Sequence, residues 1–235
     1  DSDRFTVSSC SDDISVQGDA YVHHRGWRNF SGQTACDSFE TNQVQFESSI
    51  NARKSIKLRP FGTHEAFWNN LYGQFMDINP SFIETTFAPV YQMFDSLNWS
   101  TRAQAQYLVS MIQDLPYAYI LQSESCSDKS AEGGCLTGIR YGLLSPYEFL
   151  HSEKGDCDTR AVLLCMLLKK IGLNPRIAVS EVYAHAMLMI DLPSTGAYIE
   201  EQGIRYYFWE TTYPDWDIGM IPPDCNNLSN WSIVI

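Results

Sequence analysis

The chain has 235 residues, a formal net charge of −12 and 44% hydrophobic residues, which is enough for one hydrophobic core or one core with a smaller lobe. Such an acidic chain lacks the basic face that phosphate binding requires, so nucleic acid and anionic membrane surfaces are not expected partners. No apolar run approaches the roughly 18 residues of a membrane span, and the start at Asp1 without a visible signal peptide suggests a processed or trimmed end.

The N-terminal part of the sequence is predicted to be rich in β-structure. Alternating or aromatic stretches at 4–9, 20–30 and 42–50 are separated by glycine, aspartate and asparagine. Aromatic residues at mixed spacing over 64–97 predict short helices packed on the core. We therefore expect a β-rich N-terminal region, residues 1–95, packed on a core of residues 96–235. No linker rich in proline, glycine or serine separates the two, so they are expected to form one compact unit.

Seven cysteines are many for a cytosolic protein of this size. Cys126 and Cys135 flank a polar loop and could close a small disulfide ring, and Cys10 and Cys36 could link the N-terminal region. The odd count leaves at least one thiol unpaired. These features predict an exported protein, in the periplasm, on the cell surface or outside the cell, that keeps one functional thiol.

A metal site and a bound cofactor are not expected. No cysteine pair has the C-x-x-C spacing of zinc ligands, and the five histidines are scattered along the chain.

Residues 98–115 have the pattern of an amphipathic helix. Thr101 and Gln104 have the spacing of a capping box, and Ala103, Tyr107 and Met111 begin one apolar stripe. The segment 123–144, which follows a short extended stretch, is predicted to be a surface excursion of the kind that often borders a site.

Two consecutive helices are predicted between 145 and 174. Ser145 and Glu148 form a second capping-box pattern, and Gly155 ends that first helix. The next helix is expected to begin at Cys157 with Asp156 as its N-cap. A cysteine in the first turn of a helix faces unpaired N–H groups and the positive end of the helix dipole, which predicts a lowered thiol pKa and a nucleophilic role for Cys157. Cys165, on the apolar face, fits a small core residue instead.

After this helix the hydrophobic period changes to two. Strands are predicted at 176–182, 185–191 and 204–212, with a last one near 231–235. A helix followed by a series of antiparallel strands is typical of the α+β class.

Three residues at element ends suggest a catalytic group. A cysteine nucleophile needs a base to take its proton, and that base needs a third group to orient it. His185 begins one predicted strand, and Glu210 follows the aromatic run of another. If the two strands are neighbours, His185 and Glu210 lie side by side, and we expect both to face the helix that carries Cys157.

This order of motifs resembles the transglutaminase-like cysteine peptidases, a branch of the papain-like superfold found in bacterial proteins. The segments that carry the resemblance are GDCDTRAVLLCMLLKKIGLN, AHAMLMIDLP and YYFWETTYP, with SPYEFL and LPYAYI upstream, so that it covers roughly residues 100–222. It implies a papain-like core with the nucleophile helix packed on an antiparallel sheet. It also implies Cys157 as nucleophile, His185 as base and Glu210 as orienting acid, where aspartate is the commoner third member.

The tetrahedral intermediate of such a reaction needs hydrogen-bond donors for its oxyanion. The backbone N–H of Cys157 is the expected first donor, and Gln122 and Tyr119 in the preceding segment are candidates for the second. Asp158 is expected to brace the first turn of the helix.

These residues predict an enzyme that acts on amide bonds of peptides or proteins, such as cell-wall peptides, through an acyl-enzyme at Cys157. Water would resolve the acyl-enzyme in a hydrolase, and an amine would resolve it in an acyl transferase. The alternative is an exported binding or scaffold domain that has kept the fold without the activity.

Overall fold

The computed structural model describes residue 10 and residues 12–58, 62–126 and 131–235, and the strand expected at 4–9 lies outside these ranges. The fold combines helices and sheets, as the sequence predicts. The α-helices are α1 (Gln43–Ser55), α2 (His64–Met76), α3 (Pro80–Ser96), α4 (Thr101–Asp114), α5 (Pro146–Ser152) and α6 (Cys157–Lys170). The strands are β1 (Asp13–Gln17), β2 (Ala20–Arg28), β3 (Thr34–Asn42), β4 (Tyr119–Ile120), β5 (Cys135–Leu136), β6 (Arg176–Ser180), β7 (His185–Ile190), β8 (Tyr198–Glu201), β9 (Ile204–Trp209) and β10 (Ser232–Val234). Short 3-10 turns occupy Arg140–Gly142, Pro223–Cys225 and Leu228–Asn230.

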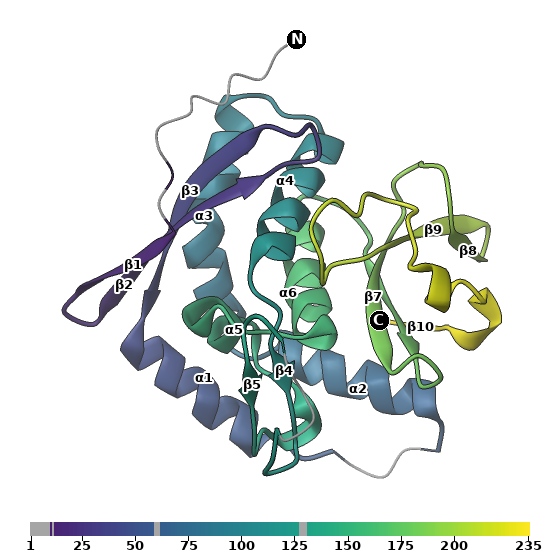
Figure 1. The fold of residues 1–235 in the computed structure, drawn as a ribbon, viewed down its shortest axis with the longest axis horizontal. Coiled ribbons are helices and arrows are strands. Elements are labelled where there is room, and N and C mark those ends of the chain that lie inside the picture. The colour runs from purple at the N-terminus through teal and green to yellow at the C-terminus, as the bar shows by residue number, and fades with distance from the viewer. Residues whose placement is uncertain (1–9, 11, 59–61, 127–130) are drawn as a thin grey trace.

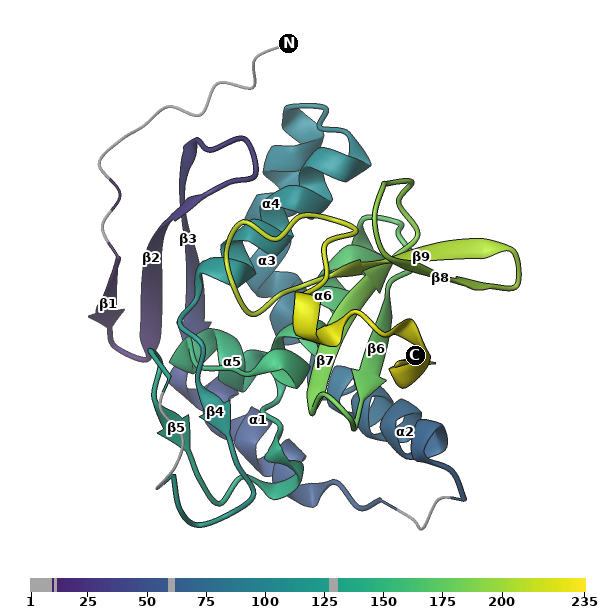
Figure 2. The same ribbon diagram turned by 45° about the vertical axis from the view of Figure 1, so that its right-hand side comes forward.

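Helices separate the two larger sheets. The first sheet has the order β1-β2-β3 and the second the order β10-β6-β7-β9-β8, each with antiparallel neighbours, while β4 and β5 form a small parallel pair. Figures 1 and 2 show α4 and α6 between these two sheets. Helix α4 packs on β2 and on α6, and α6 packs on β7. Helix α6 is therefore the central element of the molecule.

One apolar cluster extends through both parts of the chain. Trp27 and Phe39 of the first sheet belong to the same buried cluster as Leu164 of α6 and Leu188 of β7. The N-terminal strands therefore pack on the same core as the central helix. Within the described ranges, no helix has the length and apolar character that crossing a bilayer requires.

The strand predicted at 42–50 is wrong, because this segment begins helix α1. Asn42 caps the helix by accepting hydrogen bonds from the N–H groups of Val44 and Gln45. Ser49 and Arg53, four residues apart, share its buried face. Arg53 Nε donates to Glu148 of α5 at 2.8 Å, so a tertiary ion pair defines the buried face of a segment whose own apolar pattern is weak.

The predicted helix pair around Gly155 is confirmed. The capping box of Ser145 and Glu148 begins α5, and Asp156 caps α6 by accepting from the N–H of Thr159 at 3.1 Å. Helix α4 is also confirmed, but Ser100 caps it instead of the predicted Thr101. The helices over 64–97 are longer than expected, at 13 and 17 residues.

The predicted strands after α6 are confirmed as β6, β7, β9 and β10, and β8 is an additional strand that pairs with β9. Because the side chains of a strand alternate between its faces, the sheet separates two apolar clusters. Ala186 and Leu188 of β7 belong to the main core with α6, whereas Met187 and Met189 pack with Phe208 in a second cluster on the other face.

Candidate active site

Cys157 is the first residue of helix α6 and is only 6% exposed. The backbone of Ala186 on β7 makes a hydrogen bond to its sulfur. The sulfur also lies 3.6 Å from Asp158 Oδ2. The thiol is thus held between the start of the central helix and the start of strand β7. Ala186, which bonds the sulfur, immediately follows His185 in the sequence.

His185 and Glu210 form a pair at the ends of neighbouring strands. The Nε2 atom of His185 lies 2.8 Å from Glu210 Oε2, and Glu210 is 3% exposed. The other carboxylate oxygen accepts from the N–H of Thr211 at 2.8 Å and from both the N–H and the hydroxyl of Thr212 at 2.9 and 2.7 Å. Burial alone would raise the pKa of Glu210, but the bonds from His185 and Thr212 outweigh it and lower this pKa below its usual value. Glu210 is therefore an ionised carboxylate, and the proton between the pair belongs to His185 Nε2.

The strand register explains how a glutamate reaches this histidine. Leu188 pairs with Trp209 across β7 and β9. Extending this antiparallel register by one residue places Glu210 opposite Met187, so that His185 is its diagonal neighbour on the same face. Diagonal neighbours across a sheet are about 7–8 Å apart, which favours the longer of the two acidic side chains.

The expectation that His185 and Glu210 both face helix α6 is wrong in one respect. Their strand positions alternate with the residues that pack on α6, so they belong to the face that carries Met187 and Phe208. Trp231 covers that face, with its ring centroid 6.1 Å from that of His185. His185 and Asp158 of the first turn of α6 line one cavity at the ends of the strands.

The predicted lowering of the Cys157 pKa is also wrong. Burial, followed by the nearby carboxyl groups of Asp158 and Asp156, raises the pKa of this thiol well above its usual value. The sequence places one carboxyl group on each side of the cysteine, and in the structure burial together with these groups outweighs the effect of the helix N-terminus. Tyr72 of α2 donates its hydroxyl to Asp158, which fixes one of these carboxyl groups beside the sulfur.

Arg160 ties together the segments that carry the site. Its side chain is fully buried and donates to the backbone carbonyls of Gly155, Ile112, Leu115 and Thr211. These carbonyls belong to the turn before α6, the end of α4 and the residue after Glu210. One guanidinium thus joins helix α6 to the loop that follows Glu210.

Buried polar atoms without a partner gather at the same loop. Over the described residues, these atoms are Gln113 Oε1 and Thr211 Oγ1. The Nε2 atom of Gln113 donates to the backbone carbonyl of Glu210 at 2.6 Å and to that of Trp216 at 2.8 Å. Unsatisfied buried groups are rare in folded proteins, and both of these lie beside Glu210.

Two cavities adjoin the candidate triad. The His185 cavity has a volume of about 460 Å³ and is lined by His64, Trp68, Asp158, Val179, Ser180, Glu181, Ala184 and His185. The Gln113 cavity has a volume of about 500 Å³ and is lined by Gln113, Asp114, Leu115, Tyr117, Tyr119, Ala131, Glu132, Thr212, Tyr213 and Pro214. Each contains a triad residue or one hydrogen-bonded to it.

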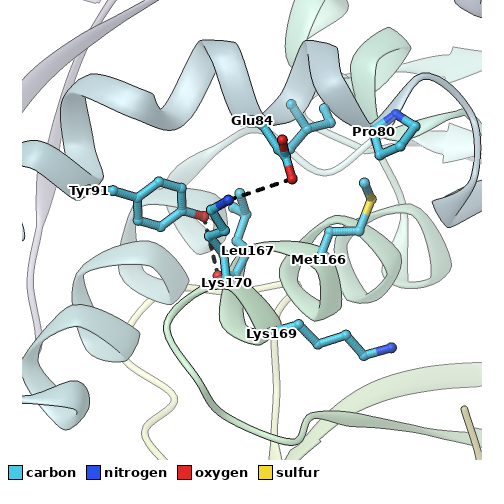
Figure 3. Close-up of a pocket in the computed structure, with 8 residues that line it drawn as sticks. Pro80, Glu84, Tyr91, Met166, Leu167, Lys169 and Lys170 are labelled. Atoms are coloured by element: carbon cyan, nitrogen blue, oxygen red, sulfur yellow. Dashed lines mark hydrogen bonds and ion pairs between the residues drawn. The ribbon is translucent and has the colours of Figure 1, made fainter.

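A third cavity, of about 270 Å³, lies between α3 and the C-terminal half of α6 (Figure 3). Glu84 and Lys170 pair across it at 3.6 Å, and Tyr91 donates to the carbonyl of Leu167. It is lined by none of the predicted site residues, and it lies at the opposite end of α6 from Cys157.

The two oxyanion candidates have different surroundings. Gln122 Oε1 accepts from the N–H of Tyr141 at 3.2 Å, while Tyr119 lines the Gln113 cavity next to Tyr117. Their proposed role stays a prediction.

Both expected cysteine pairs lie within disulfide distance. The Cα atoms of Cys10 and Cys36 are 5.7 Å apart, and those of Cys126 and Cys135 are 6.2 Å apart. Cys157, Cys165 and Cys225 are free thiols.

In the described ranges, no group of three or more histidine, cysteine, aspartate or glutamate residues is arranged to hold a metal ion.

Sequence reasoning missed the supporting residues Tyr72, Gln113, Arg160, Thr212 and Trp231. Tyr72, Gln113 and Trp231 reach the site from other elements, and the spacing around the motifs carries no signal for them, whereas Thr212 follows Glu210 within the quoted YYFWETTYP segment. Arg160 also has a signal, since an arginine three residues after Cys157 on an otherwise apolar helix is a visible anomaly.

Comparisons of the chain with protein-family models, with curated proteins and with solved structures found no match.

Proposed function

We propose that this chain is a thiol-dependent enzyme of the transglutaminase-like, papain-like type, which cleaves or transfers amide bonds of exported or cell-surface peptides. The observation that carries the proposal is the 2.8 Å pair of His185 and Glu210, together with a cysteine at the start of the central helix whose sulfur is hydrogen-bonded by the backbone of Ala186, the residue after His185. Two cysteine pairs at disulfide distance support a location outside the cytoplasm.

In the proposed reaction, the sulfur of Cys157 attacks the carbonyl carbon of the amide while its proton passes to His185. Nε2 of His185 is engaged by Glu210, which leaves Nδ1 for this proton. The oxyanion accepts from the backbone N–H of Cys157, and the proton on His185 then goes to the leaving amine as the C–N bond breaks. Water or a second amine next attacks the thioester and releases the acyl group.

The raised pKa of Cys157 defines what the base must do. A buried thiol between two carboxyl groups is predominantly protonated at neutral pH, so His185 has to remove its proton during the attack. Glu210 supports this step because its carboxylate stabilises the imidazolium that forms.

The same raised pKa favours the alternative function, a binding or scaffold domain that keeps the fold without turnover. A protonated buried thiol beside Asp158 is also what an inert core cysteine looks like.

A trapping experiment decides between these functions. The protein is incubated with a defined mixture of synthetic peptides, quenched in acid and analysed by mass spectrometry for a thioester adduct on the Cys157 peptide and for cleaved or cross-linked products. Adduct and products in the wild type, both absent in Cys157→Ala, support the enzyme. Cys165→Ala, which removes the other buried thiol of α6, is the matched control and should keep both signals. Binding of peptides without any adduct or product would favour the scaffold function.

A further inference from the structure

The Gln113 cavity is built against the acid of the candidate triad. Thr212 lines the cavity and donates to the carboxylate of Glu210, and Gln113 donates to the Glu210 backbone carbonyl. Tyr117, another wall residue, lies close enough to the nucleophile that, after burial, the Cys157 sulfur is the next cause of its raised pKa. A group bound here would therefore sit next to the reacting amide.

The charged side chains among the described lining residues of this cavity are all acidic. Asp114 and Glu132 supply two carboxylates, and the described lining contains no lysine, arginine or histidine. Gln113 is 1% exposed, and its buried Oε1 has no hydrogen-bond donor within the described chain. The orientation of this amide is well defined, because its nitrogen is engaged by two backbone carbonyls. This oxygen is buried behind the cavity wall, and a ligand N–H that reached it would satisfy it.

The negative charge of the cavity is only partly balanced. Arg25 pairs with Asp114 at 3.0 Å, but the same guanidinium also pairs with Glu153 at 3.2 Å. Glu132 and Asp12 add further negative charge around Asp114, and after burial these contributions help to raise its pKa despite Arg25. A cation entering the cavity would be attracted by this excess.

Aromatic rings complete the wall. Tyr117, Tyr119 and Tyr213 line the cavity, and the first two lie edge to face with centroids 5.4 Å apart. Tyrosine rings attract ammonium and guanidinium groups through their electron-rich faces.

We propose that the Gln113 cavity is a subsite for a basic side chain, lysine or arginine, of the peptide substrate, close to the reacting amide. This inference rests on the proposed function, because it assigns the substrate class of the same site. The carboxylates of Asp114 and Glu132 and the Oε1 of Gln113 would accept from the ammonium or guanidinium, and the tyrosine rings would cover its aliphatic stem.

Binding to the inactive Cys157→Ala variant tests the subsite without turnover. Two probes, acetyl-Ala-Lys-Ala-amide and acetyl-Ala-norleucine-Ala-amide, are titrated by calorimetry at low and high salt. We expect the lysine probe to bind more tightly, with an advantage that shrinks as salt rises. Adding Glu132→Gln should weaken the lysine probe by about twofold to fivefold, the size of an exposed ion pair, and leave the norleucine probe unchanged. Glu47→Gln, which removes one exposed charge from α1, is the matched control and should change neither.

Equal affinity of the two probes, or equal weakening by Glu132→Gln and Glu47→Gln, overturns the subsite. The wild-type peptide mixture gives an independent result. Products without a basic residue near the cleaved or transferred bond contradict the subsite and leave the proposed enzyme intact. If the lysine probe binds more tightly but the wild-type peptide mixture yields no product, the proposed enzyme is contradicted and the subsite stands.

Discussion

At Glu210, the length of one side chain determines whether the candidate triad is complete. Because His185 is a diagonal and not a direct neighbour across β7 and β9, the carboxylate has to extend along the sheet while its other oxygen stays with Thr212. An aspartate at this position would be shorter by one methylene and could not serve both partners. The strand register of this chain therefore favours glutamate over aspartate at position 210.

Shortening this side chain should therefore reduce turnover more than it reduces stability. We expect Glu210→Asp to lower kcat by at least about tenfold, because the imidazole loses the acceptor that orients it, at a cost within the range of a typical hydrogen bond of about 0.5–1.5 kcal/mol. Product formation from the peptide mixture and urea unfolding measure the two effects. Wild-type kcat in Glu210→Asp would show that the pair is structural.

Glu210 should also contribute to acid stability. Its pKa is lower in the folded chain than its ordinary value, so its contribution is present above about pH 4.3 and is lost as the pH falls through the folded pKa. Replacing it by glutamine removes this contribution. The unfolding free energies of wild type and Glu210→Gln should therefore converge as the pH falls from 5 towards 2, and curves that stay parallel in urea titrations across this window would contradict the ionised pair.

The thiol of Cys157 should respond to its neighbouring carboxyl groups. Asp158 is the leading electrostatic cause of the raised Cys157 pKa, so Asp158→Asn should move the alkylation profile of this thiol to lower pH. Iodoacetamide labelling of the Cys157 peptide, followed by mass spectrometry over a pH series, measures the shift. Glu47→Gln, which removes a distant charge, should leave the profile unchanged. A wild-type profile already centred below about pH 8.5 would contradict the raised pKa.

At the scale of elements, Asp156 has two opposed effects on helix α6. Its side chain accepts from the N–H and hydroxyl of Thr159, which stabilises the first turn. Burial, followed by the charge of Asp158, raises the pKa of Asp156 to about 8. The folded chain therefore holds the Asp156 proton more tightly than the unfolded chain does. The resulting contribution to the unfolding free energy is fully present below the ordinary pKa of about 3.9 and is progressively lost as the pH rises towards 8.

Two substitutions separate these effects. Asp156→Asn keeps a capping oxygen without the ionisable group, so it should equal the wild type near pH 4 and exceed its unfolding free energy at pH 8. Asp156→Ala loses the cap and should be less stable than Asp156→Asn by about 1 kcal/mol throughout. Urea unfolding at the two pH values gives the comparison. An Asp156→Asn variant that is less stable than wild type at pH 8 would show that the carboxylate itself is favourable.

The helices and strands of this chain differ in how well local sequence signals predict them. Capping residues and apolar periodicity located α5, α6 and strands β6, β7 and β9, because these signals are local. The sequence pattern predicts a strand where helix α1 forms, because the buried face of α1 depends on the ion pair of Arg53 with Glu148, 95 residues apart. The pairing of His185 with Glu210 could be anticipated from their positions at strand ends. Their side of the sheet, and the effect of two buried carboxyl groups on Cys157, required the tertiary arrangement.

At the scale of the whole molecule, the two cysteine pairs tie peripheral segments to a core that surrounds α6. Cys10 and Cys36 join the start of the described chain to β3, and Cys126 and Cys135 close the loop that leads into β5. The free thiols Cys157 and Cys165 are instead buried in α6. They lie eight residues apart on one helix, which corresponds to about 12 Å along the axis and is too far for a disulfide.

Non-reducing peptide mapping should therefore find these two disulfides and three free thiols. Opening the disulfides with a mild reductant should lower the unfolding free energy by about 2–4 kcal/mol for each loop, because the unfolded chain regains the entropy that the crosslinks removed. The double variant Cys126→Ser/Cys135→Ser isolates one loop, and it should keep the fold of α6 because neither residue contacts the main core cluster. Unfolding curves with and without reductant provide the measurement. Cys157 in a disulfide of the native protein would contradict both this arrangement and the proposed nucleophile, since a bonded sulfur carries no proton for His185 to accept.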